Sequence, residues 1–306
     1  MSAETHFDKV ALIGLGLIGS SIARALRQVP VAGHVVAADR SEAVVARVRE
    51  LGIADEVTTD LGAAVEGADL IIACVPVGAM GAVAEVIGPR LKPGAIVSDV
   101  GSTKGSIVAQ MAPHMPAGVQ LIPAHPVAGT EHSGPDSGFP ELFHGRWCII
   151  TPTEGADAAA VAKVEAFWQA LGSKTEVMAP DHHDLVLAIT SHVPHLIAYN
   201  IVGTASDLEQ VTESEVIKFS AGGFRDFTRI AASDPTMWRD VFLHNKEAVL
   251  EVLGRFTEDL IALQRNIRWG QGDQLFDLFT RTRAIRRSII DQRQDTADPD
   301  FGRGRK

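Results

Sequence analysis

The chain has 306 residues, of which 46% are hydrophobic and 22% charged, and its formal net charge is −10. This length accommodates two domains with separate cores, and the composition is that of a compact folded protein. The negative charge argues against a nucleic-acid binder, because neutralising phosphates requires a basic surface. An anionic substrate must therefore be bound by a local group of cationic side chains.

The two cysteines, Cys74 and Cys148, lie inside apolar runs typical of strands and lack the spacing of a metal or redox motif. We expect both to be buried, reduced thiols in a reducing compartment. The first residues contain no hydrophobic targeting segment, and no apolar run approaches membrane-spanning length. These features predict a cytoplasmic protein.

The first predicted unit is a strand, a glycine-rich turn and a helix. The apolar run Val10–Ile13 leads into GLGLIG at residues 14–19, a helical pattern follows, and a second strand at His34–Ala38 ends in Asp39. In this context GxGxxG predicts dinucleotide binding, because its glycines allow a tight turn, close approach of a pyrophosphate and close packing of helix on strand. The helix N-terminus adds unpaired N–H groups and a partial positive charge.

The acidic residue after the second strand bears on the choice of cofactor. Asp39 can accept hydrogen bonds from both ribose hydroxyls and would repel a 2′-phosphate, which favours NAD. Arg40 follows it and could pair with a 2′-phosphate, so NADP stays as the alternative. The positions expected to contact the cofactor are Gly14, Gly16, Leu17, Ile18, Gly19, Asp39, Arg40, Val75, Pro76 and Ser102.

Helices and strands continue to alternate up to about residue 178, which predicts an α/β Rossmann-type domain. The expected helices are 42–51, 61–66, 78–91 and 156–171, and the expected strands lie near Val57 and at 69–75, 95–100, 147–151 and 175–178. Two roles are open for Ser102, which follows the strand at 95–100. It is either the N-cap of a helix that begins near Lys104 or a group that faces the ligand crevice.

The stretch LIPAHPVAGTEHSG at residues 121–134 carries a histidine on a stiff backbone. Pro126 fixes its own φ and restricts His125 to extended geometry. A lone histidine in such a place is most simply a hydrogen-bonded loop residue. A catalytic role is favoured here because a dinucleotide-binding pattern precedes it and clustered histidines and arginines follow.

From Asp181 to Gln292 the pattern is helical, interrupted mainly at Gly222-Gly223 and Asp234-Pro235. We therefore expect a Rossmann-type domain at 1–178 and an all-α substrate and dimerisation domain at 179–293. The polar tail at 294–306 is expected to be disordered.

The helical half opens with four histidines: His182, His183, His192 and His195. Pro194 is expected to kink their helix and free the carbonyl of Thr190. Three interpretations are open: a zinc site, satisfied polar residues at a domain interface, or hydrogen-bond donors to an organic anion. The spacing lacks HExxH or cysteines, which argues against zinc, and we favour the third because of nearby arginines.

Those arginines, Arg225 and Arg229, are four residues apart in a segment with few other charges. An exposed helix face is the simplest interpretation for such residues. In apolar surroundings, a guanidinium usually pairs with a carboxylate of the protein or of a ligand. Asp226 and Glu131 are the internal candidates.

Five motifs carry a resemblance to a known family: GLGLIGSS at 14–21, DVGSTK at 99–104, HPVAGTEHSG at 125–134, SHVPH at 191–195 and GGFRDFTRIAASDPTMW at 222–238. From about Val10 to Gln292, the chain resembles the prephenate and arogenate dehydrogenases of tyrosine biosynthesis, also called cyclohexadienyl dehydrogenases. The combination of HPVAGTE and SHVPH is far more specific than GxGxxG. His132 stands where relatives often carry a lysine.

The resemblance implies roles for individual residues. His125 matches the catalytic histidine, and Ser102 matches a serine that hydrogen-bonds near it and the substrate. Arg229 matches an arginine that binds a substrate carboxylate, and Glu131 a gating carboxylate. Trp238 matches an aromatic residue that reaches toward the partner subunit's site, since family members are homodimers through the helical domain. The other implied cleft and pocket positions are Thr130, His183, His192, His195 and Arg225.

The implied reaction is the NAD-dependent oxidative decarboxylation of prephenate or of arogenate, which differ only in a keto or amino group. Hydride leaves C4 for the nicotinamide, the 4-hydroxyl proton passes to a base, and carbon dioxide departs as the ring aromatises. A neutral histidine with a pKa near ~6.5 suits that proton transfer. A buried arginine would fix the dianion, and we expect no metal, because aromatisation removes the need for a Lewis acid.

Two other functions are alternatives to this one. A 3-hydroxyacid dehydrogenase with a helical second domain relies on a lysine on the first helix of that domain, but this chain has none between Lys174 and Lys218. A non-catalytic NAD-binding dimer is the alternative outside the enzymes. It would have no need for His125 together with Arg229.

Overall fold

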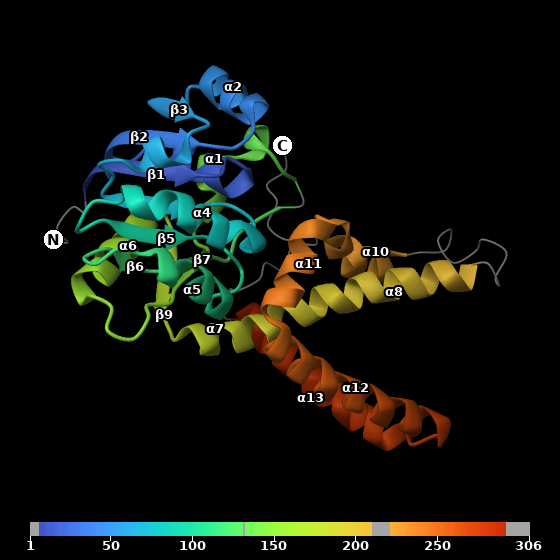
Figure 1. The fold of residues 1–306 in the computed structure, drawn as a ribbon. Coiled ribbons are helices and arrows are strands. Elements are labelled where there is room, and N and C mark those ends of the chain that lie inside the picture. The colour runs from blue at the N-terminus through green and yellow to red at the C-terminus, as the bar shows by residue number, and fades with distance from the viewer. Residues whose placement is uncertain (1–5, 131, 210–220, 292–306) are drawn as a thin grey trace. The chain divides into compact units, whose positions relative to one another are not determined.

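The computed structural model describes residues 6–130, 132–209 and 221–291 (Figure 1). The chain forms two compact units, Met1–Val249 and Leu250–Lys306. The first unit contains the sheets and the helices that follow them. The second consists of helix in its described part.

Six parallel strands form the main sheet, in the order β3-β2-β1-β4-β5-β6. Their bounds are Phe7–Ile13, Ala32–Ala38, Glu56–Thr58, Leu70–Ala73, Ile96–Asp99 and Gln120–Leu121 for β1 to β6. The strand order reverses between β1 and β4. In sheets of this kind the ligand crevice lies outside the carboxyl ends of the strands at that point.

Apolar side chains cover both faces of the sheet, as expected for parallel strands between helices. Along β1, Val10 and Leu12 join one buried cluster, and Ala11 and Ile13 join the other. The first cluster includes α1 (Leu17–Leu26) and α6 (Ala158–Ala170). The second includes α3 (Leu61–Val65), α4 (Met80–Ile87) and α5 (Gly105–Met111). Helix α2 comprises residues Glu42–Leu51. The predicted α/β domain is confirmed.

A second, three-stranded sheet carries His125. It consists of β7 (Ala124–Pro126), β8 (Trp147–Ile150) and β9 (Lys174–Val177), with β7 antiparallel and β9 parallel to β8. The sequence did not predict this separation. Ile122 still donates to Val97 in the main sheet, but Pro123 has no N–H with which to continue that ladder. Its carbonyl instead accepts from Thr151 at 2.9 Å.

The rest of the first unit is helical, as predicted: α7 (Pro180–Leu187), α8 (Val193–Glu209), α10 (Gly222–Thr228) and α11 (Pro235–His244). A π-helical turn, Ala188–His192, joins α7 to α8. It ends two residues before Pro194, as expected where a proline removes a helical hydrogen bond. Asp234 caps α11 by accepting from the Met237 N–H at 2.8 Å.

The stretch Pro180–Leu208 corrects the expectation that no apolar run approaches membrane-spanning length. It is a helical run of 29 residues with a mean hydropathy of 1.5, long and apolar enough by those criteria to cross a membrane. Its residues His183, Asp184 and His192, however, are buried and hydrogen-bonded to other parts of the first unit. Such bonding is typical of residues packed in a protein interior. Of the apolar window as a whole, 28% is buried in the described structure.

The described part of the second unit runs from Leu250 to Asp291 and contains most of α12 (Lys246–Arg268) and all of α13 (Gly272–Asp291). The break between them was not predicted. Gly270 has a φ of +65°, and the Gln271 N–H bonds back to the carbonyl of Asn266, which is the C-terminal motif that glycine favours. Large apolar side chains are exposed along both helices, including Leu250, Leu260, Ile261, Ile267, Phe276, Phe279 and Ile285. The predicted disordered tail lies outside the described residues.

Candidate active site

The glycine-rich turn has one position where the fold itself does not require glycine. Gly14 has a φ of +95°, and a Cβ on Gly19 would lie 2.0 Å from the carbonyl oxygen of Gly14, so both are needed by the backbone. A Cβ on Gly16 would meet nothing within 4 Å. Gly16 is also the N-cap of α1 and provides no side-chain cap for the helix. The open space before this helix terminus therefore fits a dinucleotide pyrophosphate.

Asp39 lies at the end of β2, held by two backbone groups. Its Oδ2 accepts from the Leu15 N–H at 2.9 Å and its Oδ1 from the Ser41 N–H at 3.0 Å. Each oxygen keeps a second lone pair that a ribose hydroxyl could use. Arg40 beside it is exposed. After β4, Val75 packs against the turn at Gly14.

A short path of contacts connects this turn to His125. Cys74 lies against Gly14 and Gly19, and burial, aided by the nearby charge of Asp99, raises the pKa of its thiol. Asp99 forms an ion pair with Lys104, and the Lys104 Nζ donates to the carbonyl of Ala124 at 2.6 Å. The predicted nucleotide turn and the predicted catalytic histidine therefore lie at the same edge of the protein core.

Ser102 does not cap the following helix, so that interpretation is wrong. The N-cap of α5 is Lys104, and its side chain does not cap the helix. The carboxylate of Asp184 does so instead, accepting from the Lys104 N–H at 2.7 Å and from the Gly105 N–H at 2.9 Å. Local sequence could not reveal this cap, because Asp184 lies 80 residues further along the chain. Ser102 is half-buried and interacts through its backbone with His192.

His125 forms a chain of hydrogen bonds with two residues of α7. Its Nδ1 lies 2.8 Å from Nε2 of His183, and the Nδ1 of His183 lies 2.8 Å from Oδ1 of Asp184. The two rings meet edge-on with centroids 5.1 Å apart. Burial lowers the pKa of His125 well below its usual range, and the charges of His183, Lys104 and His192 act in the same direction. The imidazole is therefore neutral near pH 7.

A second group of rings lies beside this chain. The Asn245 Nδ2 donates to the backbone carbonyl of Asp184 at 2.8 Å and lies 3.0 Å from Nδ1 of His192. Burial lowers the pKa of His192 to about 4. Trp238 stacks on His195, with ring centroids 3.7 Å apart. The resemblance implied that this tryptophan reaches toward a partner subunit, whereas in the structure it is buried against its own chain.

The arginines differ from the sequence expectation in their exposure. The Arg225 side chain is 80% exposed, and its nearest carboxylate is the neighbouring Asp226 at 3.8 Å. Arg229 is also exposed, so the expectation of a buried arginine is wrong for the single chain. The reason is that the segment's apolar neighbours do not enclose the guanidinium groups. Arg229 nevertheless lies close enough to His195 for its charge to oppose protonation of that ring, whose pKa is lowered chiefly by burial.

The loop after β7 brings fewer described residues to the site than expected. Thr130 is exposed, and its Oγ1 accepts from the His132 N–H at 3.3 Å. Glu131 lies outside the described residues. Further along, the Phe139 N–H donates to Ser21 on α1 at 3.1 Å, so this loop returns to the helix that follows the glycine turn.

Sequence reasoning missed four polar residues of the site: Asp99, Lys104, Asp184 and Asn245. The first two are fully buried and the others nearly so. A signal existed only for Asp99 and Lys104, which lie in the DVGSTK motif at the end of a predicted strand. Among the described residues, no group of three His, Cys, Asp or Glu side chains is arranged to hold a metal ion.

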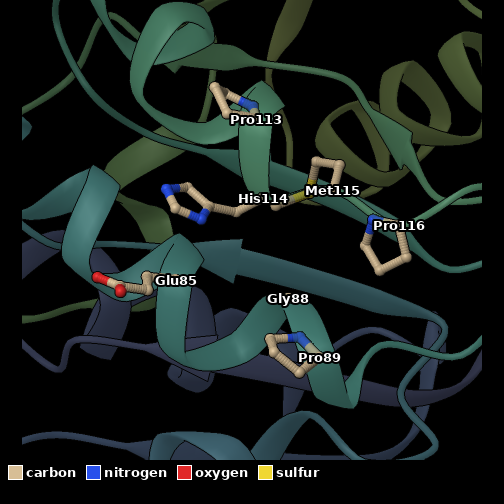
Figure 2. Close-up of a pocket in the computed structure, with 7 residues that line it drawn as sticks. All are labelled: Glu85, Gly88, Pro89, Pro113, His114, Met115 and Pro116. Carbon is tan, nitrogen blue, oxygen red and sulfur yellow. The ribbon is translucent and has the colours of Figure 1, made fainter.

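A groove of about 430 Å³ lies elsewhere, between the end of α4 and the segment before β6 (Figure 2). Prolines and backbone form most of its walls, and only Glu85 and His114 bring polar side-chain atoms. Its segments precede β5 and β6, so it lies at the amino edge of the sheet. Ligands of such sheets bind at the carboxyl edge, where the histidines are.

Comparison with known proteins identifies the family. The family model described as "Prephenate dehydrogenase, nucleotide-binding domain" matches residues 22–177, and "Prephenate dehydrogenase, dimerization domain" matches residues 179–281. The chain belongs to the prephenate dehydrogenase family. The family predicted from the motifs is thus confirmed, as are the nucleotide-binding fold and the helical dimerisation domain. The protein is an oxidoreductase.

Two relatives from this family match nearly the whole chain. A cyclohexadienyl dehydrogenase of Zymomonas mobilis is 43% identical over 285 residues, which cover 93% of this chain and 97% of that protein. A prephenate dehydrogenase of Bacillus subtilis is 31% identical, covering 96% of this chain and 79% of the relative.

Solved structures agree with these relatives. The structure of Aquifex aeolicus prephenate dehydrogenase with hydroxyphenyl propionate and NAD+ has a TM-score of 0.86 and 32% identity, covering 92% of this chain and 98% of the other. Synechocystis arogenate dehydrogenase has a TM-score of 0.79 and 27% identity, covering 92% and 99%. Members named for prephenate and members named for arogenate therefore share this fold.

Proposed function

We propose that the protein catalyses the NAD-dependent oxidative decarboxylation of prephenate, arogenate or both, in tyrosine biosynthesis. The observation that carries the proposal is the neutral, buried His125, linked by a short path of contacts to the nucleotide turn at Gly14. A base that is neutral near pH 7 can accept the proton of the substrate's 4-hydroxyl. The family and the names of its relatives support the substrate class.

The chain's own residues would bind and orient the substrate and move one proton. His125 takes the 4-hydroxyl proton while hydride leaves C4, and loss of carbon dioxide then leaves a phenolate to which that proton returns. Ser102 lies beside the histidines and would hydrogen-bond to the substrate. Arg229 would anchor a substrate carboxylate, because a guanidinium binds carboxylates in a fixed, bidentate geometry. When bound, NAD supplies the hydride acceptor.

For the cofactor we propose a preference for NAD over NADP. Asp39 supports it, because a carboxylate held by the Leu15 and Ser41 N–H groups suits ribose hydroxyls and repels a 2′-phosphate. The pyrophosphate would lie in the open space at Gly16, and the side chains of Leu17, Ile18, Val75 and Pro76 would border the cofactor. Arg40 is the residue that NADP would need, and it adjoins Asp39.

The organisation of the protein follows from the same proposal. We propose that residues 1–178 bind the dinucleotide and that 179–293 complete the substrate site and form a homodimer. The exposed apolar side chains of α12 and α13 support a buried interface on these helices. The remaining predicted pocket residues are Thr130, Glu131, His183, His192, His195, Arg225 and Trp238. A cytoplasmic location fits a biosynthetic enzyme of this kind.

The proposal is tested by measuring reduced cofactor formed from prephenate and from arogenate, each with NAD and with NADP. We expect turnover with NAD and at least one of the two substrates. Turnover of simple 3-hydroxyacids but of neither cyclohexadienyl substrate would favour the hydroxyacid dehydrogenase alternative. Binding of NAD without turnover of any of these compounds would favour a non-catalytic dimer.

A further inference from the structure

The carboxylate of Asp184 determines which ring nitrogen of His183 carries a proton. An ionised carboxylate only accepts hydrogen bonds, and this one already accepts from the Lys104 and Gly105 N–H groups. The 2.8 Å contact between Asp184 Oδ1 and His183 Nδ1 is therefore an Nδ1–H donating to oxygen. The proton of the neutral His183 ring is thus on Nδ1.

The position of that proton determines the tautomer of the next ring. A neutral imidazole with a proton on Nδ1 has only a lone pair on Nε2. The His183 Nε2 lies 2.8 Å from His125 Nδ1, so the hydrogen bond requires His125 to donate. His125 then carries its proton on Nδ1 and has a free lone pair on Nε2, which is the form that a general base needs.

We infer that Asp184 and His183 are positioning residues, which hold His125 in the Nδ1–H tautomer and so make Nε2 the basic atom. This inference rests on the proposed role of His125 as the base. Neither residue needs to touch the substrate. Their effect is to keep the proton of His125 away from the atom that must accept one, as the orienting carboxylate does in other catalytic systems built around histidine.

The surroundings of this chain of hydrogen bonds leave its residues little freedom to exchange their donor and acceptor roles. Asp184 is nearly buried and His183 fully so, and the same carboxylate caps α5. The Nδ2 of Asn245, directly after α11, donates to the Asp184 backbone carbonyl. Lys104, whose charge also acts on His125, is occupied by Asp99 and by the Ala124 carbonyl. The charged and titratable groups around His125 are thus Lys104, Asp99, Cys148, His183, His192 and Asp184.

The direct test is ¹⁵N NMR of histidine side chains in the full-length protein near pH 7, without ligand. Spectra of His125→Asn and His183→Gln identify the signals of each ring by their loss. We expect both rings to carry a proton on Nδ1 and none on Nε2. A His125 ring protonated on Nε2 would overturn the inference, whatever the activity of the enzyme.

A kinetic test uses Asp184→Asn, which keeps the shape but places an amide N–H among the three donors. We expect kcat to fall by at least about 10²-fold with a much smaller change in KM, accompanied by loss of the Nδ1–H signal of His125. Asp157→Asn is the control, because the exposed Asp157 side chain also caps a helix, accepting from the Ala159 N–H at the start of α6. An Asp184→Asn variant with normal turnover and unchanged histidine signals would overturn the role of Asp184.

The two tests separate this inference from the proposed function. If His125→Asn keeps normal turnover, His125 is not the base, but the NMR spectra still decide its tautomer. If Asp184→Asn does not fold, the spectra of the unmodified protein give the answer alone. If both rings carry their proton on Nδ1 as expected but no cyclohexadienyl substrate is turned over, only the proposed function is contradicted.

Discussion

The Nζ atom of Lys104 lies 2.5 Å from Oδ2 of Asp99, and both side chains are fully buried. The same Nζ bonds to the carbonyl of Ala124, the residue before His125. Asp99 also accepts from the N–H groups of Gly101 and Ala124. This ion pair therefore connects the end of β5 to β7 through hydrogen bonds and holds the backbone that carries the proposed base.

Removing one partner of this pair should destabilise the protein strongly. Lys104→Met leaves the Asp99 carboxylate buried without its counter-charge, and we expect the free energy of unfolding to fall by roughly 3–5 kcal/mol. The double variant Asp99→Asn, Lys104→Met should lose less, because no unpaired charge remains. Urea denaturation at one fixed protein concentration measures both, since oligomerisation makes stability depend on concentration. If Lys104→Met alone is as stable as the parent protein, Asp99 and Lys104 do not form a charged pair.

The sequence predicted the parts of this protein whose signals are local. GLGLIG at residues 14–19 stands between a strand and a helix, so its role followed from the spacing of the glycines. His125 and Ser102 were found through motifs that resemble a family. Asp184 was missed because its role depends on a contact with α5 across 80 residues of sequence. The second sheet was missed for a similar reason. Pro123 allows the chain to leave the main sheet, but it does not specify that β7 then pairs with β8, which is distant in sequence.

Gly16 and Gly19 should respond differently to the same substitution. Gly19→Ala places a Cβ against the Gly14 carbonyl and is expected to destabilise the fold, whereas Gly16→Ala meets nothing. We expect Gly16→Ala to keep the parent melting temperature yet bind NAD at least about 10-fold more weakly, because its methyl group takes up space that the pyrophosphate needs. Calorimetric titration with NAD and thermal denaturation check the two effects. Unchanged NAD affinity in Gly16→Ala would argue against a pyrophosphate at this turn.

The stability of the protein should fall below pH 6.5 in part because of His192. Its folded-state pKa is about 4, below the ordinary value of 6.5, so the unfolded chain binds the proton first as the pH falls. The stabilisation is therefore complete above pH 6.5 and is lost between pH 6.5 and about 4, amounting to about 3 kcal/mol. Unfolding free energies at several pH values, compared with those of His192→Gln, isolate this contribution. An identical pH dependence in the variant would contradict it.

His125→Asn should abolish most of the turnover while leaving binding intact. The asparagine can still hydrogen-bond but cannot accept the 4-hydroxyl proton, so we expect kcat to fall by roughly 10²–10⁴-fold. KM for NAD and for the cyclohexadienyl substrate should change little. His114→Asn serves as the control, because His114 lines the groove at the amino edge of the sheet. A His125 variant that keeps near-normal kcat would remove this residue from the proton transfer.

Arg229→Ala should act on binding more than on turnover. The guanidinium lies near His195, and we propose that it anchors a substrate carboxylate, so its loss removes a charge-assisted interaction of about 1.5–3 kcal/mol. We therefore expect KM for prephenate or arogenate to rise by roughly 10–100-fold, with kcat and KM for NAD less affected. Arg229→Lys should fall between the two, because lysine keeps the charge but loses the planar pair of donors. If steady-state kinetics give an unchanged KM for Arg229→Ala, another cation holds the carboxylate, and Arg225, four residues away, is then the first candidate.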